Sequence, residues 1–128
     1  MPTTTNQDPQ TLHKILVIED EGEMCLLLNL ILDGQGLSVD HVKTLSAAKA
    51  FLQKESPSLI LLDNRLPDGL GVDFISYIKK SLPNVKIIMI SGVDPEAADA
   101  ALEIGADHFL AKPFTKKQLQ ESIQGLLN

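Results

Sequence analysis

Three short apolar runs that end abruptly in polar residues constrain the fold of this chain more than any other feature. With the polar residues that follow them, they are Ile15–Ile18 with Glu19 and Asp20, Leu59–Leu62 with Asp63, and Ile87–Ile90 with Ser91. Short runs that are apolar throughout are typical of parallel strands covered on both faces. Because open parallel sheets bind ligands outside the carboxyl ends of their strands, we expect a functional site where these runs end.

Helical patterns alternate with the strands, and glycine or proline follows each of the first four helical segments. The sequence predicts five strands, Ile15–Ile18, Ser38–Val42, Leu59–Asp63, Val85–Ser91 and Asp107–Lys112. Each precedes a predicted helix: Glu21–Gln35, Ser46–Glu55, Val72–Leu82, about Pro95–Ile104, and a last helix with Thr115 as its N-cap. The 128 residues suffice for one domain. We assign residues 13–128 to it and residues 1–12, which lack apolar periodicity, to a flexible leader.

The second and fifth predicted strands are the polar ones, which places them at the edges of the sheet. Right-handed crossovers with the other three strands in the centre favour the order 2-1-3-4-5. The expected fold is therefore a flavodoxin-like α/β fold, with a single five-stranded parallel sheet and helices on both faces.

Composition excludes several classes of protein. A net charge of −6 argues against nucleic-acid binding by this domain alone. No apolar stretch reaches the roughly 20 residues of a membrane span, and we see no secretory pattern, so a cytoplasmic protein is expected. The single cysteine, Cys25, is expected to be a buried thiol. His13, His41 and His108 lack metal-ligand spacing and are expected to be structural or surface residues.

The predicted strand order brings Glu19, Asp20 and Asp63 together. Three neighbouring carboxylates repel unless one is protonated or a hard cation lies among them, and oxygen ligands suit Mg²⁺. The next two strand ends add the Ser91 hydroxyl and the Lys112 amine. A cation and a hydroxyl beside a metal-bound carboxylate can hold the oxygens of a phosphoryl group.

Each of these residues also has a simpler explanation. Asp20 could cap a helix, Asp63 could form a turn, Ser91 could start a loop and Lys112 could be a solvated surface charge. Their convergence on one edge of an aliphatic sheet favours the functional interpretation.

Two other sites fit the residues poorly. A haloacid-dehalogenase-type phosphatase needs a second aspartate at the position of Arg65. A dinucleotide-binding loop at Gly69–Gly71 lacks its third glycine, because Phe74 stands there.

From about Lys14 to Leu127 the chain resembles the receiver domains of two-component response regulators. The motifs that carry the resemblance are Ile18-Glu19-Asp20-Glu21, Leu62-Asp63-Asn64-Arg65-Leu66-Pro67-Asp68-Gly69 with Gly71, Ile90-Ser91-Gly92, and Gly105-Ala106-Asp107 before Ala111-Lys112-Pro113-Phe114. The resemblance implies a phosphoacceptor that assists its own phosphorylation and dephosphorylation, and not an enzyme acting on a separate substrate.

The resemblance also implies roles for individual residues. Asp63 would accept a phosphoryl group. Mg²⁺ would be held by Glu19, Asp20, Asp63 and the main-chain carbonyl of Arg65. Lys112 would pair first with the acceptor carboxylate and then with the phosphoryl oxygens.

A switch and a cis peptide are implied as well. Ser91 would move toward the new phosphate and Phe109 would turn into the vacated space. This would alter the surface formed by the predicted helix from Pro95, the fifth strand and the last helix. A cis bond is expected between Lys112 and Pro113. Alternatively, Phe109 is a core residue of an edge strand and Pro113 a helix-start proline.

The implied partners are a histidine kinase or histidine phosphotransfer protein, a downstream protein target and, on phosphorylation, a second copy of the chain. Leu26 and Leu30, on an unusually apolar helix, are hypothesised to help form a docking patch for the kinase. Two alternatives stay open: a degenerate receiver that binds partners constitutively, or the receiver fragment of a longer DNA-binding regulator or hybrid histidine kinase.

Overall fold

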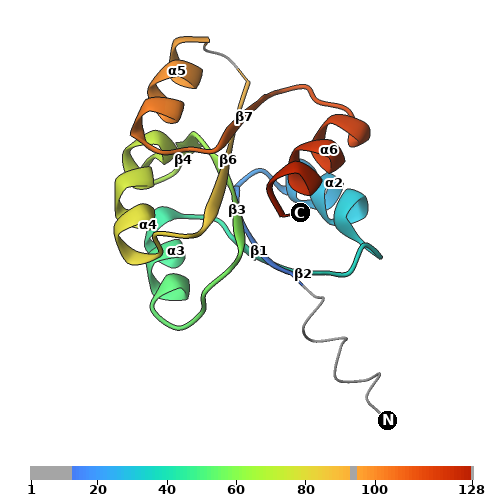
Figure 1. The fold of residues 1–128 in the computed structure, drawn as a ribbon, viewed down its shortest axis with the longest axis horizontal. Helices are drawn as coiled ribbons and strands as arrows, with labels where there is room; N and C mark the ends of the chain where they lie inside the picture. Colours follow the sequence, from blue (N-terminus) through green and yellow to red (C-terminus); the bar gives the residue numbers. More distant parts are fainter. Residues whose placement is uncertain (1–12, 93–94, 128) are drawn as a thin grey trace.

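The predicted strands form one parallel sheet in the predicted order, β2-β1-β3-β6-β7 (Figure 1). The computed structural model describes residues 13–92 and 95–127. The predicted leader, residues 1–12, lies outside them. The sheet strands are β1 (His13–Ile18), β2 (Leu37–Val42), β3 (Leu59–Asp63), β6 (Lys86–Ser91) and β7 (His108–Ala111).

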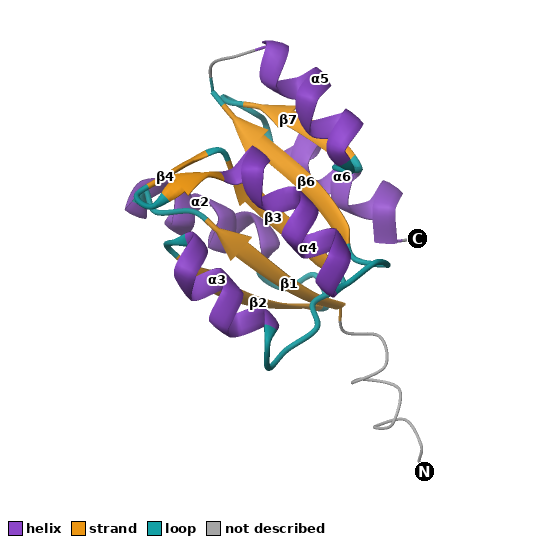
Figure 2. Cartoon of the chain, turned by 90° about the vertical axis from the view of Figure 1, so that its left-hand side faces the viewer, coloured by secondary structure: helices purple, strands orange, loops and turns teal. Residues whose placement is uncertain are grey.

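Helices cover both faces of this sheet (Figures 1 and 2). On one face lie α3 (Leu45–Leu52), α4 (Ile75–Ser81) and α5 (Pro95–Ile104), and on the other α2 (Gly22–Leu32) and α6 (Lys116–Leu127). No helix among the described residues is long and apolar enough to cross a membrane.

Alternate residues of the central strands point to opposite faces, which divides the core into two layers. In β3, Ile60 and Leu62 pack in the layer under α3, α4 and α5, whereas Leu59 and Leu61 pack in the layer under α2 and α6. All four side chains are buried. The uninterrupted apolar sequence of the central strands is therefore required by burial on both faces.

The edge strands are more exposed than the central ones. In β2, Ser38 and Asp40 are exposed, and in β7 His108 is exposed. The prediction that the two polar strands lie at the edges is confirmed.

Helices α2, α3 and α4 each differ from the prediction by three residues at one end. Helix α3 ends at Leu52 instead of Glu55. Helix α2 ends at Leu32 instead of Gln35, because Asp33 is extended, with ψ of 139°, and Gly34 follows with a positive φ of 74° that does not continue a right-handed helix. The predicted helix from Val72 begins as a 3₁₀ turn, η1 (Gly71–Phe74), before α4.

The sequence analysis also missed a two-stranded hairpin. Strands β4 (Arg65–Leu66) and β5 (Gly69–Leu70) pair in antiparallel fashion directly after β3. Two residues per strand are too few for a recognisable alternating pattern.

Threonine side chains cap the N-termini of two helices, α3 and α6. The Thr44 side chain accepts a hydrogen bond from the Ala47 N–H at 3.0 Å, at the start of α3. At α6, the Thr115 hydroxyl accepts from the Gln118 N–H at 3.0 Å, and the Gln118 side chain accepts from the Thr115 N–H at 2.9 Å. This reciprocal capping box confirms the predicted N-cap at Thr115.

Removing the cap at Thr44 tests its contribution. Thr44→Ala leaves the Ala47 N–H without its side-chain partner, so the free energy of unfolding is expected to fall by about 1 kcal/mol. Urea denaturation measures this change. Thr44→Ser keeps the hydroxyl and serves as the control; equal losses in the two variants would contradict the capping account.

Candidate functional site

The predicted site residues meet at the carboxyl edge of the sheet. Ile18 pairs with Leu62 in the register of β1 and β3, so Glu19 lies beside Asp63 at the next position. One pocket of about 500 Å³ contains all the side chains predicted to converge at this edge. Its lining residues are Glu19, Asp20, Glu21, Asp63, Arg65, Ser91, Gly92 and Lys112. The predicted convergence of four strand ends on one place is confirmed.

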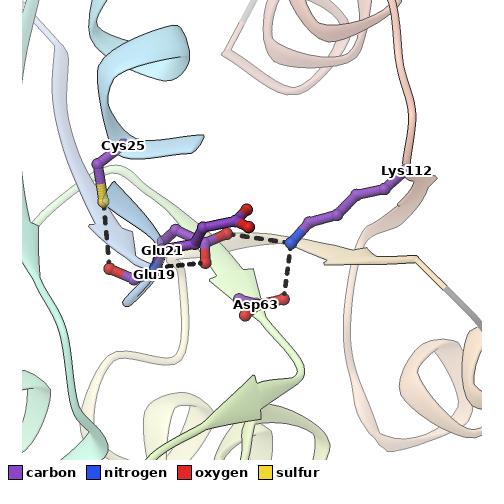
Figure 3. Close-up of polar contacts among 5 residues, drawn as sticks. All are labelled: Glu19, Glu21, Cys25, Asp63 and Lys112. Carbon is purple, nitrogen blue, oxygen red and sulfur yellow. Dashed lines mark hydrogen bonds and ion pairs between the residues drawn. The ribbon is translucent and has the colours of Figure 1, made fainter. Parts of the chain in front are cut away.

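The Lys112 amine lies between two buried carboxylates (Figure 3). Its Nζ donates to Oε1 of Glu19 and to Oδ1 of Asp63, each at 3.2 Å. Glu19 is only 2% exposed and Asp63 only 7%. Burial alone would lower the pKa of Lys112, but the two carboxylates outweigh burial and raise that pKa above 10.5. The lysine is therefore held as a cation at neutral pH.

The ionised form of Glu19 is stabilised less well than the Lys112 cation. Burial raises the pKa of the Glu19 carboxyl, and the nearby Asp63 charge raises it further. A hydrogen bond from the Glu21 N–H to Oε2, 3.1 Å long, and the Lys112 cation offset this only in part, so the pKa stays above 4.5. The ionised pocket thus carries more negative charge than Lys112 neutralises.

Glu19, Asp20 and Asp63 have the geometry of a cation site. Each offers a carboxylate oxygen, and these oxygens lie within 4.8 Å of one another. Among the described residues, no other group of three or more Asp, Glu, His or Cys side chains lies this close together. Hard oxygen donors and surplus negative charge fit Mg²⁺. The carbonyl of Arg65 as a fourth ligand stays a prediction.

Asp20 does not cap a helix. Helix α2 has Glu21 as its N-cap residue, without a side-chain capping hydrogen bond. The exposed Asp20 side chain instead lines the pocket. The simpler explanation considered for this residue is therefore wrong.

Two residues near Asp63 were missed as contributors to the site. The Asn64 carbonyl accepts from the Gly71 N–H at 2.7 Å, and its side-chain oxygen accepts from the Val72 N–H at 3.0 Å. A Cβ at Gly71 would collide with the Asp63 carbonyl oxygen and lie 3.0 Å from the Leu62 side chain. The absence of a side chain at Gly71 thus lets η1 pack against the end of β3. The sequence signal was the pair Gly69 and Gly71, which the sequence analysis weighed as a dinucleotide loop and as part of the receiver motif, without a packing role.

The residues expected to switch lie beside the site. Ser91 is buried at the end of β6, and its carbonyl accepts from the Lys112 N–H at 2.9 Å. Phe109 is half-buried and packs against the core layer under α3, α4 and α5. The Lys112–Pro113 peptide is cis, as predicted. Movement of Ser91 and Phe109 stays a prediction.

Cys25 is half-buried, so the prediction of a buried thiol is only partly right. Its Sγ donates to the main-chain oxygen of Glu19 at 3.3 Å (Figure 3). Burial raises the pKa of this thiol, and the Glu19 charge adds to the effect. The thiol therefore stays protonated and unreactive at neutral pH.

The crowded carboxylates make a prediction about stability. A folded-state pKa above 4.5 means that Glu19 favours folding most below pH 4.5, and that this contribution is lost as pH rises through the folded-state pKa. Glu19→Gln should therefore raise the Tm at pH 7 in Mg²⁺-free buffer, by differential scanning calorimetry, and flatten the pH dependence above 4.5. Glu103→Gln, on an exposed helix surface, is the control. A lower Tm for Glu19→Gln would contradict this account.

Comparison of the sequence with known families agrees with the geometry. A sequence model described as the response regulator receiver domain matches residues 15–124. The KDP operon transcriptional regulatory protein KdpE of Escherichia coli K12 is 35% identical over 86% of this chain and 49% of its own length. The phosphate regulon transcriptional regulatory protein PhoB of the same organism is 31% identical over 90% of this chain and 52% of its own length. The chain thus spans about half the length of these relatives.

Solved structures show the same similarity. A CheY-like response regulator receiver domain protein from Methanospirillum hungatei JF-1 superposes with a TM-score of 0.84 at 30% identity, covering 89% of this chain and 92% of its own. The signal receiver domain of a signal transduction histidine kinase from Syntrophus aciditrophicus gives a TM-score of 0.82 at 30% identity, covering 90% and 89%.

Proposed function

This chain belongs to the response regulator receiver domain family of two-component phosphorelay signalling, and we propose that its Asp63 accepts a phosphoryl group from a phosphohistidine. The donor is a histidine kinase or a histidine phosphotransfer protein. The observation that carries the proposal is the Lys112 amine, 3.2 Å from both Glu19 and Asp63, beside a cluster of three carboxylates.

The proposed reaction transfers the phosphoryl group from nitrogen to oxygen. A carboxylate oxygen of Asp63 bonds to phosphorus as the phosphorus–nitrogen bond of the phosphohistidine breaks, and the leaving imidazole takes up a proton. The Lys112 cation, already held next to Asp63, pairs with a phosphoryl oxygen and stabilises its charge. Glu19, Asp20, Asp63 and the Arg65 carbonyl would hold Mg²⁺, which supplies further positive charge to the phosphoryl oxygens.

The proposed output is a change of protein-binding surface. We propose that the Ser91 hydroxyl donates to the phosphate and that Phe109 follows it inward, which would reshape the surface of α5, β7 and α6. Leu102 and Ile104 of α5 are already exposed, at 47% and 42%, and would contribute apolar area to a protein target or to a second copy of the chain. The net charge of −6 over the whole chain favours a protein target over nucleic acid.

The acceptor role of Asp63 makes the first functional prediction. Incubation with acetyl phosphate and Mg²⁺ should retard the protein on a Phos-tag gel, and the shift should vanish in Asp63→Asn or when EDTA is added. Asp73→Asn is the control, because this aspartate lies in η1, away from the pocket lining. No shift in well-folded parent protein would instead favour the constitutive binding module.

We propose that the kinase docks on helix α2. Leu26, Leu27 and Leu30, here named the α2 leucine patch, are 61%, 41% and 68% exposed, whereas Leu28, Ile31 and Leu32 of the same helix are buried. The exposure expected for Leu26 and Leu30 is therefore confirmed, and the structure adds Leu27. Neighbouring exposed leucines are typical of a surface that another protein covers.

A charge placed in the α2 leucine patch should separate docking from chemistry. Leu30→Asp is expected to slow phosphotransfer from the cognate kinase about tenfold, because it buries a charge in the interface, while labelling by acetyl phosphate stays unchanged. Leu102→Asp makes the same substitution at an exposed leucine of α5 and should leave both rates unchanged. Equal losses in both assays for Leu30→Asp would reject the docking role.

A further inference from the structure

Asp68 joins two segments that are distant in sequence. It lies at the turn of the β4–β5 hairpin, yet its Oδ1 accepts from the Leu45 N–H at 2.8 Å and its Oδ2 from the Ser46 N–H at 2.9 Å. Both donors are in the first turn of α3. The carboxylate thus fixes the tip of the hairpin to the N-terminus of a helix that precedes it by more than twenty residues.

The same hairpin is fixed at its base next to Asp63. Asn64 accepts hydrogen bonds from the main chain of Gly71 and Val72. Between the base and the tip, Arg65 pairs with Leu70 and Leu66 pairs with Gly69. The Arg65 main chain, which is the expected fourth ligand of Mg²⁺, therefore lies between two fixed points.

We propose that Asp68 is a positioning residue for the cation site: by fixing the hairpin tip to α3, it sets the place of the Arg65 main chain relative to Asp63. This inference rests on the proposed function, because it assumes that the Glu19, Asp20 and Asp63 cluster holds Mg²⁺.

The hairpin needs this second fixed point. Two strands of two residues each are not stable on their own. Leu66 is half-buried and packs on the core, which gives the hairpin an apolar contact but a non-directional one. The two charge-assisted hydrogen bonds of Asp68 are directional, and they set the orientation of the tip.

The carboxylate is suited to this role at neutral pH. Its hydrogen bonds to the Leu45 and Ser46 N–H groups lower the Asp68 pKa, so the side chain is ionised. The free N–H groups and positive end of the α3 dipole favour a negative charge there. Because Asp68 is exposed, its bonds are expected to matter more for the local position of the hairpin than for global stability.

The alternative is that Asp68 serves only as a second cap of α3. Thr44 caps the same helix through the Ala47 N–H and has no hydrogen bond to the hairpin. Thr44→Ala therefore weakens the start of α3 without releasing the hairpin tip, whereas Asp68→Ala does both. The two variants form a matched pair that separates capping from positioning.

The test is the affinity for Mg²⁺ of the unphosphorylated protein. ¹⁵N-labelled parent, Asp68→Ala, Asp68→Asn and Thr44→Ala are titrated with MgCl₂, and amide chemical shifts near the pocket give the half-saturating concentration. For Asp68→Ala we expect this concentration to rise about tenfold, the lower end of what loss of a supporting contact costs a metal site. Asp68→Asn, which keeps one oxygen acceptor, should give an intermediate value, and Thr44→Ala should match the parent.

Thermal denaturation of each variant shows that it is folded at the temperature of the titration. Equal half-saturation in Asp68→Ala and the parent would overturn the positioning role while leaving the proposed function intact. An equal rise in Thr44→Ala and Asp68→Ala would also overturn it, in favour of simple capping. A parent protein that binds no Mg²⁺ would overturn the proposed function and this inference together.

Discussion

The ion pairs that Lys112 makes with Glu19 and Asp63 are the interaction on which the site depends. Two carboxylates that are nearly buried and adjacent repel each other, and burial removes the water that would screen them. One amine at 3.2 Å from both offsets part of that cost. The remaining negative charge of Glu19, Asp20 and Asp63 is of the kind that a bound cation would neutralise.

The sheet holds these groups in place. Glu19, Asp63, Ser91 and Lys112 each lie at or just after the end of a strand, and the strands are fixed by two buried core layers. Side chains placed on such rigid elements keep their mutual geometry while loops around them move. Past these ends, Leu102 and Ile104 of α5 are exposed, and they belong to the surface that is proposed to change on phosphorylation.

The parts of the structure that follow from local sequence patterns were predictable. Apolar runs with polar ends gave the strands, the polarity of two strands gave the edges, and these together placed Glu19, Asp20 and Asp63 in one pocket. The contact of Asp68 with α3 was not predictable. It joins two exposed segments 22 and 23 residues apart, and neither shows a periodicity that would reveal the pairing. The early end of α2 depends on the backbone angles of Asp33 and Gly34, which the sequence permits but does not require.

Chemical trapping of the phosphorylated residue tests the central claim most directly. Borohydride reduces an aspartyl phosphate to homoserine, which peptide mass spectrometry locates. After incubation with acetyl phosphate and Mg²⁺, the account predicts homoserine at position 63 alone, and none when Mg²⁺ is withheld. Homoserine at another aspartate, or a phosphate on the protein that borohydride does not remove, would contradict it.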